Sequence, residues 1–87
     1  MLVGLVLPDS RTNVLIAAAI AHYNGGYFRQ NEPPGQITVE SEGQMRIERA
    51  QIAAALGRPC PDEDWQALAA QPRGRVAVHT SELIVIE

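Results

Sequence analysis

Few side chains in this 87-residue chain could perform acid–base or nucleophilic chemistry. The histidines are His22 and His79, and the one thiol belongs to Cys60, which stands between two prolines. Nucleophilic catalysis needs a nucleophile and a base that converge in space, and local structure places no histidine near Cys60. We therefore expect an inert, buried thiol and no catalytic residue. A small enzyme that uses His22 or His79 stands as a third interpretation.

The spacing of the remaining polar residues fits neither a metal site nor a phosphate loop. Asp62-Glu63-Asp64 is the densest acidic run, but it lacks a partner at ligand spacing. The first turn of a helix explains it, because carboxylates there interact favourably with the helix dipole. Asn24-Gly25-Gly26 follows an expected helix and does not precede one, unlike a phosphate-binding loop. We expect no metal and no cofactor.

Aromatic side chains gather around one glycine-rich segment, which is the first candidate for a binding site. Tyr23, Tyr27, Phe28 and Arg29 lie within seven positions. Tyrosine and arginine are enriched at the energetic centres of protein interfaces, and loops commonly present such residues. These four residues are our predicted partner-binding group. The open alternative is that Tyr27 and Phe28 fold back to cover the core.

Four arginines form a second candidate group. Arg46 and Arg49 belong to one segment, and Arg73 and Arg75 precede the C-terminal strands. If the two segments pack together, their guanidinium groups would form a patch that faces phosphate groups. The alternative is a mixed-charge solvated surface, because acidic residues such as Glu48 share the same polar face.

Length and composition bound the class of protein. Eighty-seven residues, of which 46% are apolar, predict a single domain spanning 1–87. A net charge of −3 argues against a general coat for nucleic acid or membrane surfaces. The longest apolar run, Val14 to Ala21, is shorter than the ~20 residues of a membrane span. With one cysteine and no signal peptide pattern, we expect a cytoplasmic protein that does not bind membranes.

The hydrophobic pattern predicts an α+β fold, a small antiparallel sheet with two or three short helices packed on one face. The expected elements, in chain order, are a strand at 2–7, a helix at 11–23, a loop at 27–35, a hairpin at 36–48 that runs into a helix ending at 56, a helix at 62–70, and a hairpin of strands 76–79 and 83–87.

The segment from residue 36 to residue 57 has the clearest pattern. Apolar residues alternate with polar ones on both sides of Gly43, which predicts a tight hairpin. The spacing then becomes helical and stops at Gly57, a residue type that often ends helices.

This segment resembles the DNA-binding motif of the AbrB/MazE-type swapped-hairpin proteins. The residues that match the motif are Ser41, Gly43, Gln44, Ile47, Leu56 and Gly57. The resemblance implies a homodimer of interleaved hairpins with a positively charged face on DNA.

Two functional classes follow. The first is a small non-enzymatic protein-interaction module, such as an accessory or inhibitor protein of a mobile element, which binds a partner protein. The alternative is a dimeric swapped-hairpin transcriptional regulator or antitoxin that binds DNA through Arg46, Arg49, Arg73 and Arg75.

Overall fold

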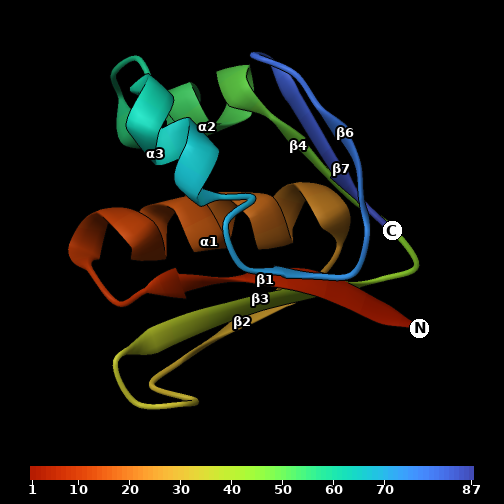
Figure 1. The fold of residues 1–87 in the computed structure, drawn as a ribbon. Coiled ribbons are helices and arrows are strands. Elements are labelled where there is room, and N and C mark those ends of the chain that lie inside the picture. The colour runs from red at the N-terminus through yellow and green to blue at the C-terminus, as the bar shows by residue number, and fades with distance from the viewer.

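The strands of the protein form two antiparallel sheets in the computed structural model, which describes residues 1–87 (Figure 1). The four-stranded sheet has the order β2 (Tyr27–Gln30), β3 (Gln36–Glu42), β1 (Leu2–Pro8), β5 (Pro72–Arg73). The three-stranded sheet has the order β4 (Met45–Glu48), β7 (Leu83–Ile86), β6 (Val76–His79). The helices are α1 (Arg11–Asn24), α2 (Arg49–Leu56) and α3 (Asp62–Ala67). The predicted α+β class is confirmed, with the strands divided between two sheets.

The pair β1–β3 is the centre of the four-stranded sheet. Its register runs from Leu2 opposite Glu42 to Pro8 opposite Gln36. Because side chains alternate along a strand, Leu5, Leu7 and Val39 share one face, and all are at most 1% exposed. Helix α1 covers this face (Figure 1).

Helix α1 begins and ends as local sequence signals predict. The Ser10 side chain accepts a hydrogen bond from the Asn13 N–H at 3.0 Å, and Gly25 ends the helix with φ 63°. The buried face consists of Ile16, Ala17, Ile20 and Ala21. The two small alanines let the helix axis lie close to its neighbours.

The expected loop at 27–35 is partly wrong. Its first four residues form β2, which pairs antiparallel with β3, with Tyr27 opposite Glu40 and Arg29 opposite Thr38. Four residues are too few to show a clear alternating pattern. They become a strand because they pair with the free edge of β3.

The expected hairpin at 36–48 is wrong, although both of its strands exist. Strand β3 pairs with β1 and β2, whereas β4 pairs with β7 in the other sheet. At Gly43 the chain therefore crosses between sheets, and the Gly43 N–H bonds to the carbonyl of Met1. The alternating pattern reports that one face of each strand is buried, and it does not specify the partner strand.

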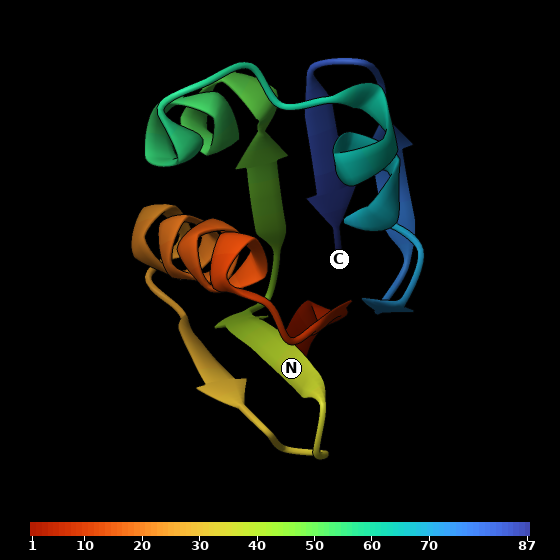
Figure 2. The ribbon, with the colours of Figure 1, turned by 90° about the vertical axis from the view of Figure 1, so that its left-hand side faces the viewer.

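The C-terminal half closes the fold around one core. Trp65 and Leu68 are at most 1% exposed, as the helical spacing predicts, and the Trp65 indole N–H bonds to the carbonyl of Thr80 at 2.9 Å. Strands β6 and β7 form the expected hairpin. Seventeen buried residues from both sheets and all three helices form one cluster. Figure 2 shows the three-stranded sheet standing beside the helices, with both chain termini near the junction of the sheets.

Candidate partner-binding surface

The predicted aromatic group divides between the two faces of β2. Tyr27 and Arg29 point away from α1, while Phe28 points towards α1 and packs against the core. Tyr27 is 46% exposed, and Tyr23, at the last turn of α1, is 54% exposed. The group thus offers two tyrosines and Arg29 to solvent, and Phe28 supports β2 from behind. Whether it binds a partner remains a prediction.

Leu2 extends this exposed surface. Leu2 stands opposite Glu42 on β3, and Tyr27 stands opposite Glu40 on the other side of β3. Their side chains therefore share the outer face of the sheet, the one opposite α1. Leu2, the first residue of β1, is 46% exposed. The sequence indicates this exposure, because side chains alternate along a strand. Leu2 is an odd number of residues from the buried Leu5 and Leu7, so its side chain points to the opposite face of the sheet.

The other half of this outer face is already covered. The Thr38 hydroxyl donates to the carbonyl of Glu32 at 3.2 Å, so the connection between β2 and β3 folds back beneath the sheet. Thr38 and its cross-strand neighbour Val6 are 1% and 6% exposed. The exposed apolar area of this face is therefore confined to the end that holds Leu2 and Tyr27.

The four predicted DNA-binding arginines do not form one patch. Arg46 and Arg73 are exposed, but they lie in different sheets. Arg75 forms an ion pair with Glu87. Arg49 turns into the protein at the start of α2, where its side chain is 18% exposed. Only two of the four guanidinium groups are free for an external partner.

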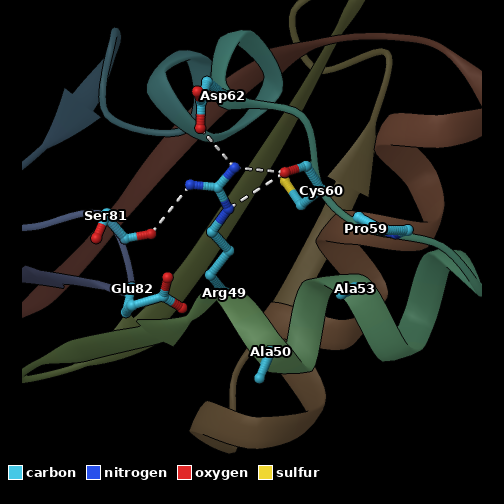
Figure 3. A pocket seen from close by; sticks show the side chains of 8 residues that line it. All are labelled: Arg49, Ala50, Ala53, Pro59, Cys60, Asp62, Ser81 and Glu82. Carbon is cyan, nitrogen blue, oxygen red and sulfur yellow. Dashed lines mark hydrogen bonds and ion pairs between the residues drawn. The ribbon is translucent and has the colours of Figure 1, made fainter.

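Arg49 lies in a surface hollow of about 480 Å³ between α2, the segment before α3 and the β6–β7 turn (Figure 3). Its guanidinium donates to the carbonyl of Cys60 through Nη2 at 2.6 Å and Nε at 3.2 Å, and to the carbonyl of Ser81 at 3.1 Å. It also contacts the Asp62 carboxylate at 2.7 Å and lies 5.7 Å from the centre of the Trp65 ring. The arginine thus joins three segments of the chain.

The pKa shifts of Arg49 and Cys60 are consistent with a structural role for both residues. The hydrogen bond that Arg49 donates to the Asp62 carboxylate raises the pKa of Arg49, so the guanidinium stays charged. Burial raises the pKa of the Cys60 thiol, although the Arg49 charge acts in the opposite direction. Cys60 therefore carries its proton at neutral pH and is a poor nucleophile.

The histidines lie apart from this hollow. His22 is exposed on α1 and makes an edge contact with the Tyr23 ring at 5.2 Å, and His79 is exposed on β6. No group of three or more histidine, cysteine and acidic side chains is placed to hold a metal ion. None of the three helices has the length and apolar character needed to cross a membrane.

The protein is a small α+β fold that exposes Leu2 and Tyr27 on the outer face of its four-stranded sheet and Tyr23 at the end of α1. The model of the MmoB/DmpM family matches residues 1–87, and the chain belongs to this family. It comprises regulatory proteins of monooxygenase hydroxylase complexes. The prediction of a small module with a protein partner is confirmed at this level.

Two solved structures share the fold over the whole chain. Both are described as structures of the phenol hydroxylase–regulatory protein complex. One chain has a TM-score of 0.80 at 20% identity, with coverage of 100% of this chain and 98% of that chain. The other has a TM-score of 0.73 at 21% identity, with coverage of 100% and 99%. No curated protein matches the sequence.

The resemblance to AbrB/MazE-type proteins is wrong. The matching family spans the whole chain and is a different one, and β3 and β4 do not form the hairpin on which the resemblance rested. The Ser41 hydroxyl instead donates to the carbonyl of Gln44, within the crossing between the sheets. Nothing here supports DNA binding, a homodimer or an origin in a mobile element.

Proposed function

We propose that this protein is a regulatory component of a monooxygenase, which binds the hydroxylase component and changes its turnover without performing a chemical step itself. The full-length match to the MmoB/DmpM family carries the proposal. The shared fold supports it, because the similar chains come from complexes of phenol hydroxylase with its regulatory protein. We also place the protein in the cytoplasm, where the unpaired Cys60 would stay reduced.

The side chains of the protein are consistent with a non-catalytic role. Cys60 is buried and protonated, and Arg49 already binds three groups of its own chain. The exposed His22 and His79 belong to different elements, one on α1 and one on β6. An effect on turnover would therefore arise from binding, through a preference for one conformation of the hydroxylase.

We further propose that Tyr23, Tyr27 and Arg29 contact the hydroxylase, while Phe28 holds β2 in place. The two tyrosines combine a large apolar ring with a hydroxyl, which suits the buried centre of an interface. Arg29 is oriented by ion pairs with Glu32 at 3.5 Å and with Glu40. These residues lie on an exposed edge strand and at a helix end, where a partner can reach them.

The test uses the purified hydroxylase of the source organism, with phenol as the first substrate. We expect the protein to bind the hydroxylase in a calorimetric titration and to change its turnover in a saturable way at the same concentrations. The hydroxylase with an equal amount of serum albumin serves as the control. No heat of binding together with unchanged turnover would refute the proposed function.

A further inference from the structure

Exposed large apolar side chains concentrate at one end of the molecule. Of the five, Met1, Leu2, Tyr23 and Tyr27 lie at the end where β1 and β2 begin and α1 finishes, and only Leu15 lies elsewhere. Figure 1 shows these segments together on the side of the chain termini. Exposed apolar side chains that gather at one end of a molecule commonly mark an interaction site. We call Leu2, Tyr23 and Tyr27 the apolar patch.

Two free arginines flank the apolar patch. Arg73 stands opposite Gly4 on β1, two residues along from Leu2 and on the same outer face of the sheet. On the other side, the Asn24 side chain bonds to both the N–H and the carbonyl of Arg46, at 2.8 and 2.9 Å. Since Asn24 directly follows Tyr23, this contact holds Arg46 beside the end of α1.

Two arginines at this end have no ionic partner. The glutamates of this end are all paired: Glu40 with Arg29, Glu42 with the N-terminal ammonium, and Glu87 with Arg75. Arg46 and Arg73, in contrast, are exposed and form no ion pair. Two unpaired guanidinium groups beside an apolar patch suit a partner with carboxylates around an apolar surface.

We propose that the apolar patch and its flanking arginines, Arg46 and Arg73, dock onto an apolar segment of the hydroxylase that carries acidic side chains. This inference rests on the proposed function and specifies the chemistry of the partner surface. The apolar patch supplies the desolvated centre, and the two arginines supply orientation and attraction at its rim. The two unpaired arginines of this site are too few for the multiple phosphate contacts of a nucleic-acid site.

Calorimetric titration of the same hydroxylase tests the apolar patch with matched variants. Leu2→Ser and Tyr27→Ala should each weaken Kd at least tenfold. Leu15→Ser is the matched control, because Leu15 and Leu2 are 48% and 46% exposed. We expect it to change Kd less than twofold. Circular dichroism checks that each variant retains the fold.

Charge reversal tests the arginines. Arg46→Glu plus Arg73→Glu should weaken Kd at least tenfold at low salt and should flatten the dependence of Kd on salt. Arg58→Glu is the control, because Arg58 is exposed near the end of α2, away from the patch. Equal effects of the control and the double variant would overturn the role of Arg46 and Arg73.

A photo-crosslinking amino acid at position 27 identifies the partner segment directly, with position 15 as the control. We expect a single hydroxylase peptide that contains apolar and acidic residues, crosslinked from position 27 only. A basic or wholly polar peptide would overturn the inference. If the wild-type chain binds the hydroxylase but the patch variants bind equally well, the inference fails while the proposed function stands. If the wild-type chain does not bind, the proposed function itself fails.

Discussion

Arg49 shows why a residue type alone does not identify a binding site. In the sequence it follows a strand and begins a helix, a common position for a phosphate contact. In the folded chain its guanidinium is used internally, by the carbonyls of Cys60 and Ser81 and by the Asp62 carboxylate. Because guanidinium donors match planar arrays of oxygen acceptors, one arginine can join three segments. Its contacts join residues up to 32 positions apart.

Asn24 performs a similar task with a neutral side chain. Its amide donates to the carbonyls of Ile20 and Arg46 and accepts from the Arg46 N–H, so it imitates a neighbouring strand at the edge of β4. This amide links the end of α1 to the three-stranded sheet.

Asn24→Ala should lower the free energy of unfolding by about 2 kcal/mol, because three hydrogen bonds of roughly 0.5–1.5 kcal/mol each are lost. Urea denaturation followed by circular dichroism measures the change. Gln44→Ala is the matched amide control, since Gln44 is exposed. That control should shift stability by less than about 0.5 kcal/mol. Equal losses in the two variants would contradict the role of Asn24.

At the scale of elements, β3 is the strand that organises the four-stranded sheet. Strand β1 and the residue just before β2 both approach it unusually closely, at Gly4 and Gly26. A Cβ at Gly4 would lie 1.9 Å from the carbonyl oxygen of Val39, and one at Gly26 would lie 2.2 Å from that of Glu40. No side chain fits at either position unless the strands separate.

Gly4→Ala should therefore destabilise the protein by about 3 kcal/mol, the upper end of the range for overpacking. Gly43→Ala provides a contrast, because Gly43 has φ 79° and open space around it. Its cost should be only the left-handed backbone penalty of about 1 kcal/mol. Thermal and urea unfolding measure the stability of both variants. If Gly4→Ala lost less stability than Gly43→Ala, this would contradict the close approach of β1 to β3.

At the scale of the whole molecule, the two sheets share one core. Buried residues from β1, β3, β4 and β7 belong to the same cluster as those of the three helices. We therefore propose that the chain folds as one domain. Every strand finds its neighbours within a single chain, so the fold has no need of strands exchanged with a second copy.

Light scattering on a sizing column should give a mass near 9.4 kDa for the isolated protein. The mass should not change across a tenfold range of concentration, because no strand is left without an intramolecular partner. A dimer that persists on dilution would contradict this arrangement and would point to exchange of β4 between chains.

The sequence by itself determined the local elements. The cap at Ser10, the stops at Gly25 and Gly57, and the inward spacing of Trp65 and Leu68 are all set by residues within a few positions. The clustering of aromatic side chains around Tyr27 is likewise a local feature, because it depends on residue type and short spacing.

Only the tertiary structure decided which strands pair and which arginines are free. The alternation of β3 and β4 is the same whether they pair with each other or with β1 and β7, because it reports burial of one face and not the neighbour. Likewise, Arg46 and Arg49 look equivalent in sequence. One is exposed and the other is enclosed, since the Cys60 and Ser81 carbonyls reach Arg49 from distant parts of the chain. The surface formed by Leu2, Tyr27 and Arg73 exists only because β1, β2 and β5 share one sheet.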